Sequence, residues 1–155
     1  MQHFNPGDIV SFSNFGSNKA IGIVIEKMKD YSNAYCVMFD KECSRYTHFC
    51  DGLVIDSRGY YCLAEHLKLI SERKSDISFN VGDLVFLQKK RMFGIITSVL
   101  MNRKTKNKKF NVSVTYPIRN SKLNIESEAK DIILIEKSKN CLVKRQKRKI
   151  ADLLR

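Results

Sequence analysis

The sequence of 155 residues contains no tryptophan, only two prolines and no apolar run that approaches the length of a membrane span. Because a spanning helix needs about 20 consecutive apolar residues, we expect no membrane-spanning helix and no membrane partner. Residues Met1–Pro6 have neither the charged region nor the apolar core of a secretory signal. We therefore expect a cytoplasmic protein, in which the five cysteines, an odd number, are reduced thiols.

Motifs of enzymes and of metal sites are also missing. There is no glycine-rich loop ending in Lys-Ser or Lys-Thr and no dinucleotide-binding fingerprint, so we expect no catalytic activity and no cofactor. The cysteines and histidines that fall close together in the sequence are Cys43, His48, Cys50, Cys62 and His66. No pair of them has the Cys-x2-Cys spacing of common zinc sites, which favours no metal and small core residues at Cys50 and Cys62.

The positive charge of the chain is confined to its second half. Lys and Arg number 28 against 16 Asp and Glu, a net charge of +12. Residues 1–75 have a net charge of zero, residues 76–136 of +5 and residues 137–155 of +7. This asymmetry indicates a binding surface for an anionic partner, nucleic acid above all, built by the second half. The alternative is a lysine-rich face that only contacts solvent.

Four sequence blocks occur twice in the same order, which indicates an internal duplication. The matched blocks are Phe4–Val10 with Phe79–Val85, Ile21–Val24 with Phe93–Ile96, Tyr35–Phe39 with Val112–Tyr116, and Ala64–Ile70 with Ala129–Ile135. We interpret residues 1–72 as a first small barrel, residues 77–136 as a second, and residues 137–155 as a basic tail.

Each copy has the pattern of a β unit. The turn dipeptides Gly7-Asp8 and Gly82-Asp83 come directly before alternating apolar residues. Gly22 and Gly94 lie inside apolar runs, where a glycine marks a sharp bend or a close backbone approach. Asp51-Gly52 predicts a tight hairpin. The expected fold class is therefore mostly β, with two tandem small barrels.

The order of these signals resembles the KOW and Tudor families of SH3-like small barrels. The residues that carry the resemblance are Gly7, Asp8, Val10, Gly16, Lys19, Gly22 and Val24, with Gly82, Asp83, Val85, Gly94 and Ile96 in the second copy. The resemblance covers about residues 4–136, and the second copy lacks a counterpart of the loop 16–19. It implies a binding module for nucleic acid, ribosomes, RNA polymerase or modified peptides. Size and charge also resemble an early DNA-binding protein of T-even phages, which implies action on the host nucleoid or on transcription.

The basic residues of the second half gather in short segments. Lys89–Arg91 comes before the glycine-containing strand of the second copy. The segment Arg103–Lys109 has five positive charges in seven residues between two strand-like stretches, which predicts a hairpin tip. Such a tip repels itself until phosphates neutralise it. The alternative is a charged surface loop without a ligand.

The tail has helical spacing, with apolar residues on one stripe, and predicts a basic amphipathic helix over about residues 141–154. We predict phosphate contacts from the lysines and arginines of these segments, which are Lys89, Lys90, Arg91, Arg103, Lys104, Lys106, Lys108, Lys109, Arg119, Lys122, Lys144, Arg145, Lys147, Arg148 and Lys149. Phosphate contacts give affinity with little base discrimination.

The aromatic residues bear on the kind of nucleic acid. Most of them lie in the neutral first copy, and cations without interleaved rings favour double-stranded DNA over single strands that stack on rings. RNA is the alternative nucleic acid, and an adaptor for RNA polymerase, the ribosome or a nucleoid protein is the alternative function, with the partner on the first copy. An aromatic cage for a methylated lysine would use Phe12, Phe15, Tyr31 or Tyr35, whereas rings that fill the barrel are the simpler interpretation.

Overall fold

The chain divides into two compact units, Met1–Ser75 and Asp76–Arg155, which we call unit 1 and unit 2. In the described part of the chain, no helix is long and apolar enough to cross a membrane. The structure is a computed structural model, and it describes residues 2–13, 19–40, 43, 45–75, 77–116 and 123–138.

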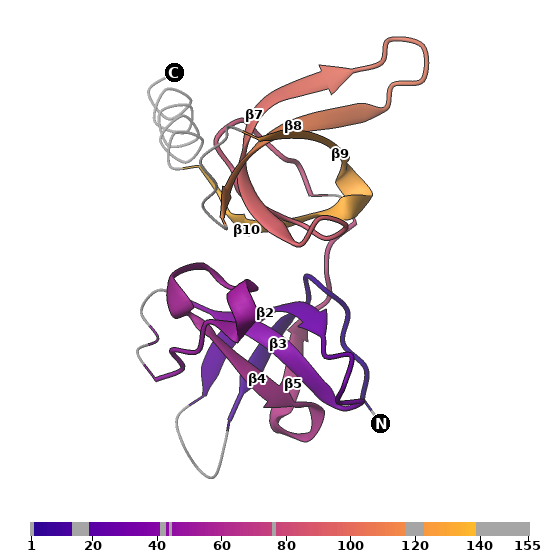
Figure 1. Ribbon diagram of the computed structural model, residues 1–155. Helices are drawn as coiled ribbons and strands as arrows, with labels where there is room; N and C mark the ends of the chain where they lie inside the picture. The colour runs from indigo at the N-terminus through magenta and orange to yellow at the C-terminus, as the bar shows by residue number, and fades with distance from the viewer. Residues whose placement is uncertain are drawn as a thin grey trace, which may run out of the picture. The chain divides into compact units, whose positions relative to one another are not determined.

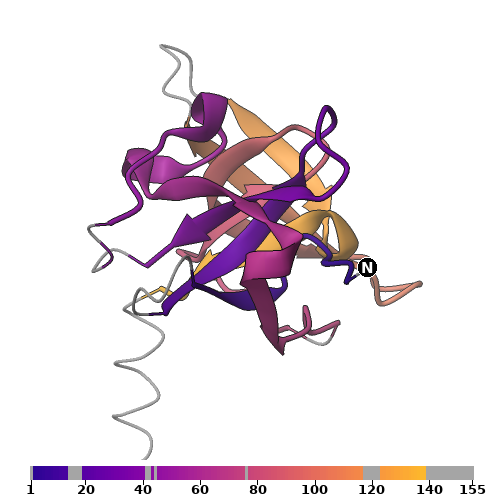
Figure 2. The same ribbon diagram turned by 90° about the horizontal axis from the view of Figure 1, so that it is seen from below.

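Each unit is a five-stranded antiparallel sheet that curls around its own interior (Figures 1 and 2). In unit 1 the strand order is β4-β3-β2-β1-β5, and in unit 2 it is β9-β8-β7-β6-β10, so the two units have the same topology. The strands of unit 1 are β1 (Ile9–Phe12), β2 (Ala20–Lys27), β3 (Ala34–Phe39), β4 (Gly59–Leu63) and β5 (Leu67–Ser71). Those of unit 2 are β6 (Leu84–Leu87), β7 (Met92–Met101), β8 (Lys108–Tyr116), β9 (Asn124–Glu128) and β10 (Ile132–Glu136).

The predicted tandem β architecture is confirmed by these two sheets. In both units a short 3₁₀ turn comes before the last strand, as η3 (Ala64–His66) in unit 1 and as η4 (Ala129–Asp131) in unit 2. The helix predicted over about residues 141–154 lies outside the described residues.

The interior of each unit is filled by alternating strand residues. Val10 and Phe12 of β1 point to the same side of their strand and are buried in one cluster with Val24 and Val37. The corresponding cluster of unit 2 contains Val85, Leu87, Ile96, Phe110, Val112 and Ile132. Burial of each such side chain stabilises the fold by about 1.5–3 kcal/mol.

Equivalent glycines let neighbouring strands approach closely. A Cβ atom on Gly22 of β2 would lie 2.6 Å from Cγ1 of Val37. A Cβ atom on Gly94 of β7 would lie 2.5 Å from the carbonyl oxygen of Ser113. Any side chain at either position would therefore push the adjacent strand away, which explains why each glycine stands in an apolar run.

A buried aspartate closes the turn before the first strand of unit 1. Gly7 has a φ of 93°, in the left-handed region that favours glycine, and it places Asp8 in the interior with 2% of its surface exposed. The Asp8 carboxylate accepts hydrogen bonds from the backbone N–H groups of Asn5, at 2.8 Å, and Arg73, at 2.9 Å. Because Arg73 follows the last strand, we call this arrangement an aspartate clamp.

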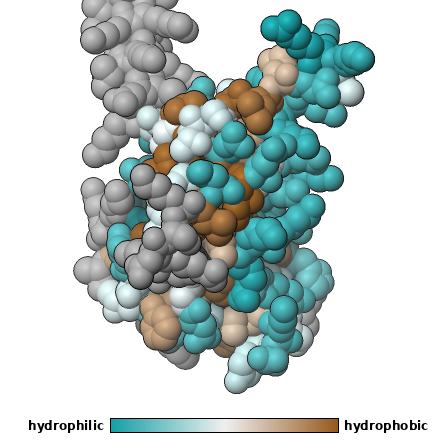
Figure 3. Space-filling view, turned by 45° about the horizontal axis from the view of Figure 1, so that its top comes forward, coloured by the Kyte–Doolittle hydropathy of each residue, from teal (hydrophilic) through white to brown (hydrophobic). Residues whose placement is uncertain are grey.

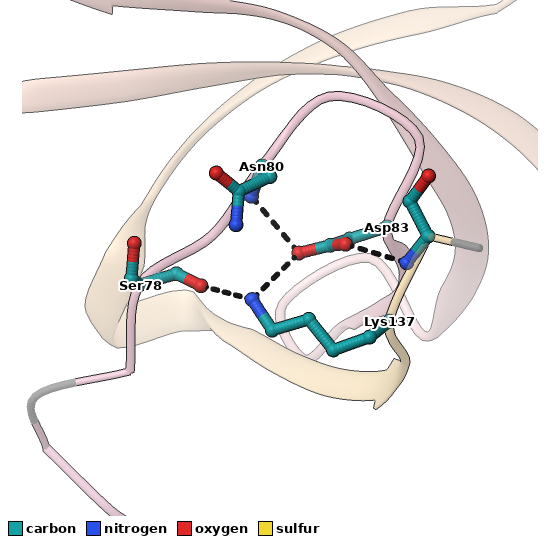
Figure 4. A network of polar contacts seen from close by, with 5 residues as sticks. Ser78, Asn80, Asp83 and Lys137 are labelled. Atoms are coloured by element: carbon teal, nitrogen blue, oxygen red, sulfur yellow. Dashed lines mark hydrogen bonds and ion pairs between the residues drawn. The ribbon is translucent and has the colours of Figure 1, made fainter. Parts of the chain in front are cut away.

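Unit 2 repeats the clamp with one added ion pair (Figure 4). The Asp83 carboxylate, fully buried, accepts hydrogen bonds from the backbone N–H groups of Asn80 and Ser138, both at 2.9 Å. The ammonium group of Lys137 lies 3.1 Å from the same carboxylate and also donates to the carbonyl oxygen of Ser78. The repeated Gly-Asp dipeptide is therefore a structural element that joins the beginning of each unit to its end.

The structure corrects one of the sequence matches. The sequence equates Tyr35 with Val112. In the structure Val112 pairs with Ile96 of β7, whereas the corresponding residue of β2, Val24, pairs with Val37. Val37 is therefore the counterpart of Val112, and the sequence match is wrong by two residues. A shift of two keeps every side chain on the same face of the strand, so the alternation of apolar residues does not detect it.

The Asp51-Gly52 dipeptide does not form the predicted hairpin. Cys50–Gly52 is a 3₁₀ turn, η1, in which Cys50 and Asp51 have φ values of 49° and 52°. Cys50 and Val54 are both fully buried, and both lie over Gly59, where an added Cβ would come within 2.8 Å of either side chain. Burial of these residues against β4 outweighs the local turn preference, so the prediction is wrong.

Strand β3 is buried on both of its faces. Alternate residues from Tyr35 onward face the interior of unit 1, and Cys36 and Met38 face the other way. Cys36 contacts Cys50 of the long connection to β4, of which residues 40, 43 and 45–58 are described. This connection covers the outer face of β3 and gives unit 1 a second buried layer.

Candidate nucleic-acid interface

Strands β7 and β8 form a hairpin that extends beyond the rest of unit 2. Their pairing runs from Phe93 opposite Tyr116 to Met101 opposite Lys108, and Figure 1 shows the outer part projecting away from the other strands. The turn occupies residues 102–107. The segment Arg103–Lys109 is thus at the tip of a hairpin, as the sequence predicts, with its last residues already in β8.

The side chain and backbone of Asn102 organise the tip. Its side-chain oxygen accepts hydrogen bonds from the backbone N–H groups of Lys104, at 3.0 Å, and Thr105, at 3.3 Å. Its backbone N–H donates to the carbonyl oxygen of Asn107 at 2.9 Å, and its carbonyl oxygen accepts from the N–H of Lys106 at 2.8 Å. The tip therefore has a defined conformation that positions the side chains it carries.

Four cations at the tip are exposed, and none has an ion pair with any described residue. We call them the tip cations, and they are Arg103, Lys104, Lys106 and Lys108. The next lysine, Lys109, differs because its ammonium group lies 3.1 Å from the carboxylate of Glu126 on β9. The acidic residues of β9 thus compensate charge near the barrel and leave the tip positive.

The other predicted basic segment, Lys89–Arg91, forms the turn between β6 and β7. Lys89 lies 3.1 Å from the carboxylate of Asp131, whereas Lys90 is exposed without an ion pair to any described residue. Arg91 has a φ of 52°. Ion pairing at an exposed lysine contributes about 0–1 kcal/mol to stability, so Lys89 can leave Asp131 and bind a phosphate instead.

Cations from separate segments meet in a depression of about 260 Å³ in unit 2. Lys89, Lys90 and Lys109 line it together with Lys130 of η4. Lys130 carries no sequence signal because it stands alone between acidic residues, and only the fold brings it to the other lysines. Its ammonium group lies 3.3 Å from the carboxylate of Glu128, so the depression has mixed charge.

A larger cleft, of about 800 Å³, runs along the hairpin and is also confined to unit 2. Phe79, Leu100 and Met101 contribute apolar walls, and Lys106 and Lys108 contribute cations. We call this space the hairpin cleft. Figure 3 shows hydrophilic side chains on the projecting tip and apolar side chains where the hairpin joins the rest of the unit.

The remaining predicted contacts lie outside the described residues. They are Arg119 and Lys122, between β8 and β9, and the tail residues Lys144, Arg145, Lys147, Arg148 and Lys149.

Among the described aromatic side chains of unit 1, Phe4, Phe12, Tyr35 and Phe39 are buried, whereas Tyr31, Phe49 and Tyr60 are exposed. Phe12 and Tyr35 are buried, which fits rings that fill the barrel, and Phe15 lies outside the described residues. Tyr31 is 64% exposed and does not join them. A further aromatic cluster, which the sequence does not predict, contains Phe12, Tyr46 and Tyr60. The ring of Phe12 lies 5.0 Å from that of Tyr46, and the ring of Tyr46 lies 5.2 Å from that of the half-exposed Tyr60.

The predicted cysteine and histidine candidates do not converge on a metal site. Among the residues that the structure describes, no group of three or more His, Cys, Asp or Glu side chains could hold a metal ion. A hydrogen bond from Cys36, together with the adjacent His48, lowers the pKa of Cys50 to about 7 against the effect of burial. Burial raises the pKa of Cys62 above the usual thiol range.

Comparisons with known proteins give likeness only at the level of structure. No protein-family model matches the sequence, and no curated protein matches it. The crystal structure of AGDP1 AGD34 from Arabidopsis thaliana is similar over 85% of this chain and 82% of its own, with 17% identity and a TM-score of 0.32. The tandem Agenet domain 3-4 of ADCP1 is similar over 85% and 80%, with 18% identity and a TM-score of 0.31.

At this level the similarity supports no conclusion about function. The strand order and register show two five-stranded antiparallel sheets of the same topology, and the resemblance to KOW and Tudor barrels stays a prediction from the sequence. An identity with the T-even phage early DNA-binding protein MotB, to which size and charge point, is not supported by these comparisons.

Proposed function

We propose that this protein binds nucleic acid, double-stranded DNA first, through the phosphate backbone and largely without sequence preference. The observation that carries the proposal is the set of four tip cations, which are exposed, held on an ordered hairpin and not paired with acids among the described residues. Condensed counterions are released when such cations meet phosphates, and this release favours binding. Lys89, Lys90 and the basic tail add further phosphate contacts.

The contrast with Lys109 supports this assignment of roles. Strand β9 supplies Glu126 to Lys109, so this lysine has a partner within the protein. The tip cations project past the end of β9 and have no such partner among the described residues. Mutual repulsion of uncompensated like charges weakens the folded state slightly, and a polyanion removes this repulsion.

A salt titration tests the proposal. If about 6–8 phosphates are neutralised, the affinity for a 20-base-pair duplex falls about a thousandfold or more between 50 and 200 mM salt. Fluorescence anisotropy of a labelled duplex measures this slope. An affinity that is independent of salt, or the same affinity for a neutral polymer, would disprove the proposal.

The tip is tested by a variant that changes only the unpaired cations, Arg103→Gln, Lys104→Gln, Lys106→Asn and Lys108→Gln. Asparagine is chosen at 106 because this position has a φ of 57°, which asparagine tolerates. Since each phosphate contact contributes about 1 to the salt slope, we expect the slope to fall by about 4. The matched control removes four exposed lysines of unit 1, through Lys19→Gln, Lys27→Gln, Lys29→Gln and Lys68→Gln, and should change it by less than about 1.

An adaptor function is the second candidate, and the surface of unit 1 favours it. Its sequence has no net charge, and Ile21, Phe49 and Ile70 are more than half exposed. Exposed apolar side chains of this kind are found at protein interfaces. Capture of RNA polymerase or a nucleoid protein that survives nuclease treatment, and that is unchanged in the tip variant, would establish the adaptor function instead.

A further inference from the structure

The hairpin cleft combines an apolar wall with a cationic edge. Leu100 is 46% exposed and Met101 is 58% exposed, although both lie beside the most highly charged segment of the described chain. Phe79 is partly buried, and its ring packs edge-on against Phe110 at 5.3 Å, which leaves it on the wall of the cleft. Exposed apolar surface beside charge is unfavourable in water and indicates a ligand.

The cations of the cleft are arranged along the same hairpin. Lys108 pairs directly with Met101 across the strands, so their side chains lie on one face. Lys106 lines the cleft from the turn. The acidic residue on the wall, Glu128, is already paired with Lys130 at 3.3 Å. The cleft therefore presents net positive charge next to apolar surface, which suits a ligand with both an anionic and an apolar part.

We infer that the hairpin cleft binds an unpaired nucleotide of a nucleic-acid strand, with its base against Phe79, Leu100 and Met101 and its phosphate near Lys106 and Lys108. This inference rests on the proposed function and adds to it a preference for nucleic acid with unpaired bases. Sites for molecules of nucleotide size have volumes of about 300–1,000 Å³, which includes that of the cleft. Proteins that bind single strands join a positive groove to side chains on which bases stack.

The structure brings a ring and cations of the second half together, whereas the sequence predicts them apart. In the sequence Phe79 lies more than 25 positions from Lys106 and reads as a core position of a strand. In the structure it comes before β6 and lines the same cleft as Lys106. A cleft that joins Phe79 and Phe110 to several lysines, among them Lys106 and Lys108, thus arises only after folding.

The test compares an intact 20-base-pair duplex with the same duplex that contains a central two-nucleotide bulge, at one salt concentration. We expect the wild-type protein to bind the bulged duplex about tenfold more tightly, because the unpaired bases gain contacts with the cleft. In the variant Leu100→Thr/Met101→Thr the preference should fall to about twofold or less, with affinity for the intact duplex nearly unchanged. Both residues are exposed and threonine suits strands, so the variant should fold.

Ile21→Thr provides the matched control, because Ile21 is 56% exposed on a strand of unit 1. It should keep the tenfold preference. Equal affinity of the wild-type protein for both duplexes would overturn the inference and leave the proposed function standing. Absence of salt-dependent binding to either duplex would overturn both, so the two failures are distinguishable.

A second measurement locates the base. Photocrosslinking of the bulged duplex with 5-iodouracil in the bulge, followed by mass spectrometry, should identify the peptides that contain Phe79 or Met101. Crosslinks confined to unit 1, for example at Phe49, would place the unpaired base elsewhere and overturn the inference even if the bulge is preferred.

Discussion

The two units share one framework and differ in the connection that is enlarged. Both have the aspartate clamp, the strand glycine and the 3₁₀ turn before the last strand. Unit 1 is enlarged between β3 and β4, where the connection folds back over β3 and contributes buried residues. Unit 2 is enlarged at the β7–β8 hairpin, which projects and remains exposed.

The shared features and the differing features have different roles, because the first stabilise each unit and the second are placed for recognition. The aspartate clamp and the strand glycine, which the two units share, are buried, and they hold the interior and the ends of each barrel together. The features that differ are loops and strand ends, where binding residues are most often found. In unit 1 the enlarged connection adds the buried residues Cys50 and Val54, whereas in unit 2 the enlarged hairpin adds unpaired cations. Divergence of the copies has therefore left the framework intact.

The largest expected effect comes from breaking the shared clamp. Asp83→Ala removes a buried carboxylate and leaves two backbone N–H groups and Lys137 without their acceptor, so unfolding should become easier by about 3–5 kcal/mol. Asp8→Ala removes two backbone hydrogen bonds but no ion pair, so it should destabilise unit 1 by less. Urea unfolding gives the size of each effect, and hydrogen exchange shows which unit loses protection.

The exposed Asp30→Ala is the control for both variants and should change stability by less than about 0.5 kcal/mol. Loss of protection in both units from a single clamp variant would contradict the view that each clamp serves its own barrel.

The next effect concerns the strand glycines. Gly94→Ala places a Cβ 2.5 Å from a backbone oxygen and should destabilise unit 2 by about 1–3 kcal/mol through overpacking. Gly22→Ala should have a similar effect in unit 1. Gly52→Ala meets no atom but has a φ of 84°, so it isolates the backbone cost of about 1–2 kcal/mol. Thermal melts compare the three, and an unchanged melting temperature for Gly94→Ala would contradict the close strand approach.

These shared features are the part of the fold that sequence patterns predict. The Gly-Asp turns, the strand glycines and the alternation of Val10 with Phe12 are local signals that occur twice, so the copies support each other. The predicted hairpin at Asp51-Gly52 does not form, because burial of Cys50 and Val54 determines the conformation of that segment. Burial depends on residues far away in the sequence. For the same reason, sequence patterns do not predict that Phe79 and Lys130 line the hairpin cleft, since only folding brings them to the hairpin.

A smaller change in duplex affinity tests the role of the ordered tip. Asn102→Ala removes the acceptor for the N–H groups of Lys104 and Thr105 without changing the net charge. Loosening the tip adds an ordering cost of about 0.5–1.5 kcal/mol on binding, so duplex affinity should fall about twofold to tenfold. The salt slope should stay the same, because the cations remain. A changed slope with unchanged affinity would contradict this role.

The smallest effect concerns the enlarged connection of unit 1. The pKa of Cys50 is lowered to about 7, so its thiolate predominates above pH 7 and its thiol below. Because Cys50 is fully buried, its ionisation is followed by the ¹³Cβ chemical shift in protein with labelled cysteine, which should change with a midpoint near pH 7, below the pKa of about 8.5 of a free thiol. Cys36→Ala removes the hydrogen bond from Cys36 and should move the midpoint upward. A midpoint that is the same in both proteins would show that Cys36 has no influence.

The aspartate clamps have a consequence for how such a protein can arise. In each unit the segment after the last strand, at Arg73 or Ser138, lies 2.9 Å from a carboxylate of the first turn, so the two ends of the barrel meet. A gene segment bounded at these points can be copied head to tail without disturbing the interior of either product. For the same reason, a circular permutant of unit 2 that is opened in a surface loop would keep its core contacts.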